Sequence, residues 1–170
     1  MIDVAVLLTQ HWPADEDWEA LAVRAVNAAL AQTPHGDLAA SAVAVEVSVK
    51  FADDDEVHAL NASYRGKDRP TNVLSFPMVQ PDLLDGLDIG DDDGEVLLGD
   101  IILAEGVCRR EAAEKAASVA NHATHLIVHG MLHLLGYDHI DDAEAEAMEG
   151  IERAALATLH IADPYAIDDN

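Results

Sequence analysis

Three histidines near the C-terminal end of the chain have the spacing of a metal site. His129 and His133 lie four residues apart in an apolar stretch, and His139 follows after Gly136. Residues four apart share one face of an α-helix, about 6 Å apart along its axis at roughly 1.5 Å rise per residue. Gly136 can take a positive φ and end the helix, so that the chain turns back and brings His139 to the same face. Three imidazoles without a fourth protein ligand are typical of catalytic zinc, where water takes the open position. The pattern predicts a metal-dependent hydrolase with ligands His129, His133 and His139.

A histidine on an apolar helix is more often a hydrogen-bonded core residue than a ligand. The four-residue spacing and the third histidine past a glycine favour metal binding over that alternative. His122 and His125 precede the motif at helical spacing, and we expect them to be packing residues. Three imidazoles suit one Zn²⁺ per chain best, although Ni²⁺ and Fe²⁺ also accept them.

The residue after the first histidine argues against the commonest zinc chemistry. In the helical zinc-protease motif this residue is a glutamate that acts as general base. Here it is Gly130, which can neither accept nor deliver a proton. A zinc-dependent peptidase or amidase stays an alternative, but it would need a base from elsewhere in the chain.

Three segments of the sequence together resemble the YbeY family, and they occur in that family's order. The first is the histidine motif, His129-Gly130-x-Leu132-His133-Leu134-x-Gly136-x-Asp138-His139. The second starts at Asn61 and includes Tyr64-Arg65-Gly66-Lys67-Asp68-Arg69-Pro70-Thr71-Asn72-Val73-Leu74-Ser75-Phe76-Pro77. The third is Leu98-Gly99-Asp100-Ile101. The resemblance spans about residues 60 to 152.

The resemblance implies a single-strand-specific, zinc-dependent endoribonuclease that acts in rRNA maturation and ribosome quality control. Its implied partners are rRNA precursors, a small-subunit ribosomal protein and an assembly GTPase, and the position of Asp100 is linked in the family to partner binding. A non-catalytic ribosome-assembly factor with a structural metal is a further alternative. Structural zinc sites usually have four protein ligands, which argues against it.

Phosphodiester cleavage needs a cation near the charge that develops on the phosphoryl oxygens. The planar guanidinium of Arg65 can contact two such oxygens, which Lys67 cannot imitate. We therefore predict Arg65 and His129 as catalytic residues. The alternative is a solvated turn in which Asp68 compensates the neighbouring positive charges. Asp138 could orient a ligand imidazole, cap the following helix or close the turn. The general base could be metal-bound water, the 2′-hydroxyl of the substrate or Asp138.

The overall charge argues against nucleic-acid binding, whereas its distribution does not. The chain has 9 Lys and Arg against 33 Asp and Glu, a net charge of −24, whereas phosphate binding normally relies on basic surface. Three of the nine positive residues, Arg65, Lys67 and Arg69, fall within five positions. Local potential at a cleft matters more than net charge when one phosphate is engaged.

The 170 residues fit one domain with a single core. A single cysteine, Cys108, excludes an internal disulfide, suits the cytoplasm and is expected to be a packing thiol. No targeting segment or membrane span is recognisable, so we expect a cytoplasmic protein without a membrane partner.

The elements that must position the histidines follow from hydrophobic periodicity. We expect strands at 2–9, 43–49, 71–76 and 95–104. We expect helices at 15–31, 53–62, 106–117, 118–135 and 141–159, and a loop at 81–94. This order predicts an α+β fold, with a mixed sheet of about four strands and the histidine helix packed on it. One metallohydrolase domain is expected over 1–162, followed by a poorly ordered polar tail at 163–170.

Overall fold

The computed structural model describes residues 2–9, 12–40, 44–79 and 95–165. They form a four-stranded mixed sheet in the order β1-β2-β4-β3. Strands β1 (Ile2–Leu8), β2 (Ala44–Ala52) and β4 (Glu95–Ala104) run parallel, and β3 (Val73–Pro77) pairs antiparallel with β4. The predicted α+β fold with a mixed sheet of about four strands is confirmed. The expected loop at 81–94 and the start of the expected strand at Val43 lie outside the described residues.

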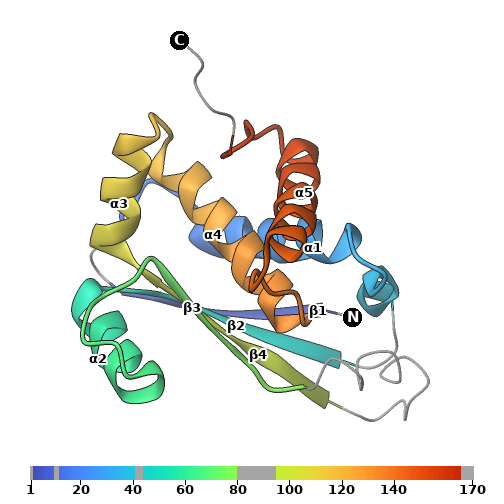
Figure 1. Cartoon of the computed structure of the whole chain (residues 1–170), viewed down its shortest axis with the longest axis horizontal. Helices are drawn as coiled ribbons and strands as arrows, with labels where there is room; N and C mark the ends of the chain where they lie inside the picture. Colours follow the sequence, from blue (N-terminus) through green and yellow to red (C-terminus); the bar gives the residue numbers. More distant parts are fainter. Residues whose placement is uncertain (1, 10–11, 41–43, 80–94, 166–170) are drawn as a thin grey trace.

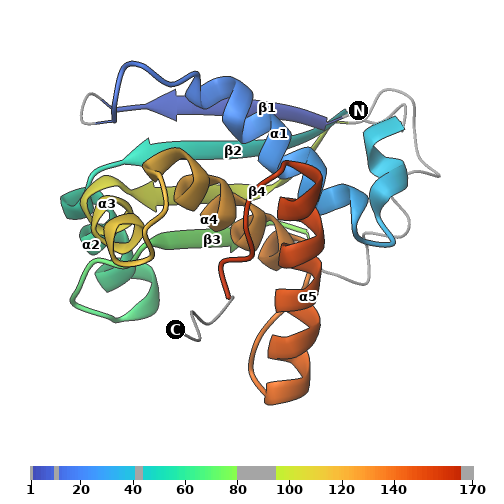
Figure 2. The same ribbon diagram turned by 90° about the horizontal axis from the view of Figure 1, so that it is seen from above.

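Five α-helices surround this sheet within the described ranges. They are α1 (Trp18–Ala31), α2 (Asp54–Arg65), α3 (Glu105–Glu114), α4 (Val119–Leu134) and α5 (Asp142–Thr158). Helix α5 packs on α1 and α4. Figure 1 shows α1, α4 and α5 on one face of the sheet and α2 on the other. Seen from above, α1 crosses β1 and β2, whereas α4 follows β4 and β3 (Figure 2). A short 3₁₀-helix (Gly36–Ala40) was not predicted. None of the helices in the described ranges is long and apolar enough to cross a membrane.

The helix starts follow from side-chain capping. The side chains of Asp17, Asp53, Ser118 and Asp141 each accept a hydrogen bond from the backbone N–H three residues later. These bonds satisfy N–H groups that have no partner inside the helix. The N-cap residues thus set the starts of α1, α2, α4 and α5, within a few residues of the expected bounds.

The main core lies between the sheet and helices α1 and α4. In β2, Val45, Val47 and Val49 are fully buried against this layer, so alternate residues of the strand face the core. Two glycines bring α4 close to β4. A Cβ at Gly130 would lie 2.9 Å from Ile101 Cγ2, and one at Gly99 would lie 2.6 Å from Leu134 Cδ2. Any larger residue at either position would push the histidine helix away from the sheet.

The segment expected to be a polar tail makes contacts at its first residues. The carboxylate of Asp163 accepts hydrogen bonds from Arg153 Nε at 3.2 and 3.1 Å. The Tyr165 hydroxyl donates to Glu152 at 2.9 Å. Residues 163–165 therefore contact α5, and residues 166–170 of the expected polar tail lie outside the described part of the chain.

Candidate active site

The end of α4 brings the third histidine to the first two. Leu135 is the C-cap and Gly136 follows with a φ of 97°. The backbone N–H of Gly136 donates to the His133 carbonyl, and that of Tyr137 donates to the Leu132 carbonyl, both at 3.0 Å. This pair of bonds defines a Schellman motif, which needs a left-handed residue at the position of Gly136. The predicted helix stop is confirmed, and the chain turns back to place His139 beside α4.

The three imidazoles converge on one point. His129 Nε2 and His133 Nε2 lie 3.0 Å apart, and the ring centroid of His139 lies 5.6 and 5.2 Å from those of His129 and His133. One ring nitrogen from each histidine falls within 4.8 Å of the other two. Nitrogens bound tetrahedrally to zinc at about 2.0–2.1 Å are separated by roughly 3.3 Å. The donor set therefore fits a divalent metal, and no carboxylate or thiol joins it among the described residues.

The protonation state of His133 also suits metal binding. Burial and, to a smaller extent, the neighbouring His129 and His139 together lower the pKa of His133 to about 4, against a smaller opposing effect of Asp138. The imidazole is then neutral at neutral pH, which is the form that binds metals.

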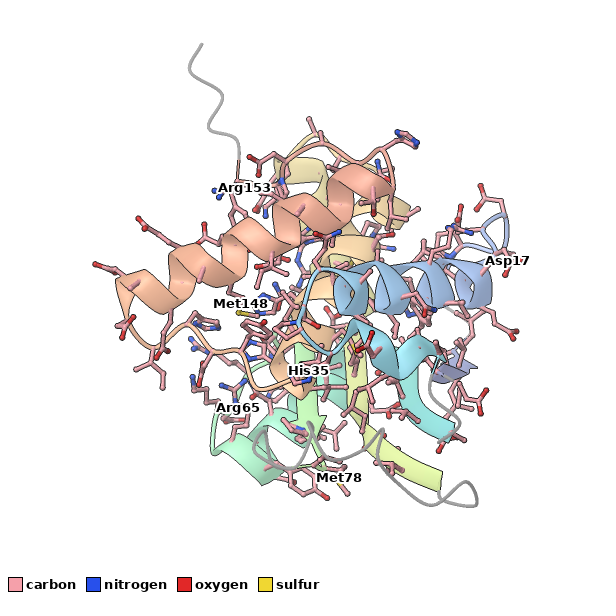
Figure 3. All side chains as sticks on the ribbon, turned by 90° about the vertical axis from the view of Figure 1, so that its right-hand side faces the viewer. Asp17, His35, Arg65, Met78, Met148 and Arg153 are labelled. Atoms are coloured by element: carbon pink, nitrogen blue, oxygen red, sulfur yellow. The ribbon has the colours of Figure 1, made fainter. Side chains whose placement is uncertain are left out.

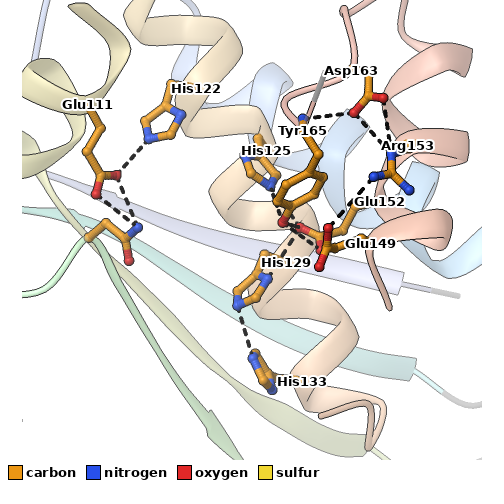
Figure 4. A network of polar contacts seen from close by, with 11 residues as sticks. Glu111, His122, His125, His129, His133, Glu149, Glu152, Arg153, Asp163 and Tyr165 are labelled. Carbon is orange, nitrogen blue, oxygen red and sulfur yellow. Dashed lines mark hydrogen bonds and ion pairs between the residues drawn. The ribbon is translucent and has the colours of Figure 1, made fainter. Parts of the chain in front are cut away.

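A buried carboxylate lies behind His129. Glu152 Oε1, on α5, is 3.3 Å from His129 Nδ1 and 2.8 Å from His125 Nε2, and the Tyr165 hydroxyl also donates to it (Figure 4). Burial acts to raise the pKa of Glu152, but the hydrogen bonds from His125 and His129 outweigh it and lower the pKa to about 2. We did not predict Glu152 from the sequence. The available signal was a charged residue among the buried positions Met148, Ala155 and Leu156 of one helix face.

The histidines lie in a cleft of about 610 Å³ that also contains the basic loop after α2. Arg65, Lys67 and Arg69 all line this cleft. Arg65 is the last residue of α2 and lies on the side facing the loop after α4 (Figure 3). Within the described ranges, ion pairs to carboxylates involve Lys50, Arg109, Arg110 and Arg153 but not these three residues. Their positive charge is thus directed to the cleft.

Two neighbours of the histidines take roles that the sequence left open. Asp138 Oδ1 accepts the backbone N–H of His139 at 2.8 Å, and the cap of α5 is Asp141. Asp138 therefore does not cap the helix, and its carboxylate bonds the backbone of the histidine that follows it. Gly130 faces Ile101 of the sheet, so a side chain at the position of the protease glutamate would point away from the cleft.

The residues expected to pack do so. His122 and His125 are buried, and their Nε2 atoms lie 2.8 Å from Glu111 and Glu152. Cys108 is fully buried, and burial, with the charges of Glu111 and Glu105, raises its pKa to about 12. The thiol is thus protonated and inert.

Two histidines of α4 and a third from the loop after it converge beside a basic loop, in a cleft that could hold a divalent metal next to a phosphate. Comparisons with known proteins agree. The family model described as "Endoribonuclease YbeY" matches residues 8–160. The chain is 66% identical to "Endoribonuclease YbeY" of Rhizorhabdus wittichii over 170 residues, covering 100% of both chains. It is 58% identical to the protein of that name from Sphingopyxis alaskensis, over 99% of this chain and 100% of that protein.

A solved structure supports the fold alone. A Thermotoga maritima protein known from a solution structure matches with a TM-score of 0.55 and 22% identity, over 99% of each chain. The family model and the two relatives show that the chain belongs to the YbeY family. The individual roles of Arg65 and of the three histidines stay predictions.

Proposed function

We propose that this chain is a zinc-dependent endoribonuclease that cleaves single-stranded RNA in rRNA maturation and ribosome quality control. The relatives at 66% and 58% identity carry the name endoribonuclease. The observation that supports the proposal most directly is that Arg65 and the three histidines line one cleft. A phosphate in this cleft could contact a guanidinium and a metal at once.

In this proposal His129, His133 and His139 hold the ion through ring nitrogens. A zinc ion held there would supply Lewis-acid chemistry next to the scissile phosphate. Arg65 contacts two phosphoryl oxygens and stabilises the charge that develops on them. Arg65 forms no ion pair with a carboxylate within the described residues, so it need not break one to contact the phosphate.

The electrostatics of the cleft also support a nucleic-acid substrate. Although the chain carries a net charge of −24, Arg65, Lys67 and Arg69 line the cleft on the side of α2. The acidic remainder of the surface would repel RNA from other sites, so that productive binding concentrates at the cleft. Binding should therefore weaken with salt, but with a shallow slope that reflects few phosphate contacts.

The competing peptidase function has little support from the geometry, because residue 130 faces the sheet. The test is to incubate the zinc-loaded protein with single-stranded RNA, the same RNA annealed to its complement, and an unstructured peptide. We expect cleavage of the single strand, little cleavage of the duplex and none of the peptide. Peptide cleavage without RNA cleavage would refute the proposed function, and a protein inactive on all three substrates would favour the non-catalytic assembly factor.

A further inference from the structure

Glu152 is the most deeply buried charged side chain near the histidine cluster. Its side chain is 1% exposed, and three groups surround it: His125 Nε2 at 2.8 Å, His129 Nδ1 at 3.3 Å and the Tyr165 hydroxyl at 2.9 Å. Burying an ionised carboxylate is unfavourable unless donors compensate it. The buried carboxylate of Glu152 contacts His129 of the cluster. It does not cap α5, because Asp141 is the N-cap of that helix.

The contacts of Glu152 determine which nitrogen of His129 carries the hydrogen. A carboxylate only accepts hydrogen bonds, so the Nδ1 of His129 that faces it must be the donor. In the neutral ring the other nitrogen, Nε2, then has its lone pair free. This Nε2 is the atom that lies 3.0 Å from His133 Nε2, inside the cluster. The tautomer selected by Glu152 is therefore the one that presents a lone pair to the cluster.

We propose that Glu152 is a positioning residue that fixes the ring orientation and tautomer of His129 for metal binding. The inference rests on the proposed function, in which the three histidines hold a metal. Carboxylates that accept the second ring N–H of a ligand histidine typically change metal affinity by 10–100-fold when removed. Glu152 touches neither metal nor RNA and acts through His129.

The segment after α5 holds the carboxylate in place. Tyr165 donates to both carboxylate oxygens, at 2.9 and 3.0 Å. Asp163 accepts the backbone N–H of Tyr165 at 2.8 Å and pairs with Arg153, whose guanidinium carbon lies 5.4 Å from the centre of the tyrosine ring. These contacts fix the phenol on α5 (Figure 4). Residues 163–165 thereby become part of the scaffold of the site.

A purely structural role is the competing explanation. Glu152 could serve only to join α5 to α4 through His125, whose Nδ1 is buried and has no hydrogen-bond partner among the described residues. That role predicts lower stability of Glu152 variants but unchanged zinc affinity of the folded fraction and an unchanged tautomer of His129. The two explanations are therefore separated by metal affinity and by NMR.

The experiment compares Glu152→Leu and Glu152→Gln with wild type and with a control, Glu149→Gln. Glu149 lies one turn earlier in α5, is half-exposed, and pairs with Arg153 at 3.7 Å but forms no hydrogen bond or ion pair with a histidine of the cluster among the described residues. Zinc affinity is measured on metal-free protein by competition with a chromophoric chelator, after circular dichroism has shown that each variant is folded. Long-range ¹H–¹⁵N NMR of the metal-free protein gives the tautomer of His129.

We expect Glu152→Leu to lower zinc affinity by about 10–100-fold and to move the His129 hydrogen from Nδ1 toward Nε2. Glu152→Gln should lower zinc affinity less, because its amide oxygen can still accept a hydrogen bond from His129 Nδ1. The zinc affinity of Glu149→Gln should stay within about twofold of wild type. Wild-type affinity and tautomer in a folded Glu152→Leu variant would overturn the inference. If that variant does not fold, wild-type affinity in both Glu152→Gln and Tyr165→Phe would overturn it. A wild-type protein that binds no zinc would instead refute the proposed metal site, whereas the tautomer still tests the role of Glu152.

Discussion

Replacing Gly130 by alanine tests how closely the histidine helix packs on the sheet. The new Cβ would lie 2.9 Å from Ile101 Cγ2 and 3.3 Å from Ile101 Cγ1, closer than the optimal carbon separation of about 3.5–4.0 Å. Overpacking of this kind typically costs about 1–3 kcal/mol, whereas alanine gains about 0.8–1 kcal/mol over glycine inside a helix. The expected net effect is a loss of up to about 2 kcal/mol of unfolding free energy.

Gly150→Ala in α5 is the matched control. A Cβ there has no heavy atom within 4 Å, so only the helix-propensity gain of about 0.8–1 kcal/mol applies. Thermal unfolding of the metal-free proteins measures both variants, at roughly 2–4 °C in Tm for each kcal/mol in a chain of this size. If Gly130→Ala is as stable as Gly150→Ala, residue 130 does not face the sheet in solution. The argument that a base at this position would point away from the cleft would then fail.

Three further predictions concern the cleft and the core. Arg65→Lys should keep the fold and the metal but lower RNA cleavage by about 10²–10³-fold, because lysine cannot contact two phosphoryl oxygens at once. Arg24→Lys on α1 is the control. If Arg65→Lys cleaves RNA within a few-fold of the wild-type rate, Arg65 belongs to a solvated turn. His133→Ala should lose metal and lower the melting temperature of protein purified with zinc, because metal binding couples to folding; full occupancy in that variant would mean that the ligand set is wrong. Cys108, with its pKa raised by burial to about 12, should not react with a thiol reagent at pH 8 until the protein is unfolded, and rapid labelling of the native protein would contradict its burial.

Local patterns predicted most of the fold. Hydrophobic periodicity indicated β2 and α4, and Gly136 indicated where α4 ends. These signals are local because hydrophobic period and capping act over a few residues. The strand order could not be read in the same way, since pairing β1 with β2 and β2 with β4 depends on contacts far apart in the sequence.

The candidate site was predictable only in part. The spacing of the three histidines predicted that they converge, and they lie in one cleft with Arg65, whose role stays a prediction. Glu152 was not predicted, because a single glutamate in a helix has no distinguishing pattern until α5 is seen to place it behind His129. Tyr165 falls in the segment expected to be a poorly ordered polar tail, and the sequence did not indicate its contact with Glu152, because that contact depends on how the chain turns after α5.

The central claim is that three histidines hold a metal on which RNA cleavage depends. The most direct measurement is the metal content of protein purified without added metal, paired with RNA cleavage before chelation, after chelation and after return of stoichiometric zinc. The account predicts about one divalent metal per chain, loss of cleavage with the metal and its recovery with zinc. Metal-free protein that cleaves RNA at the wild-type rate would contradict it.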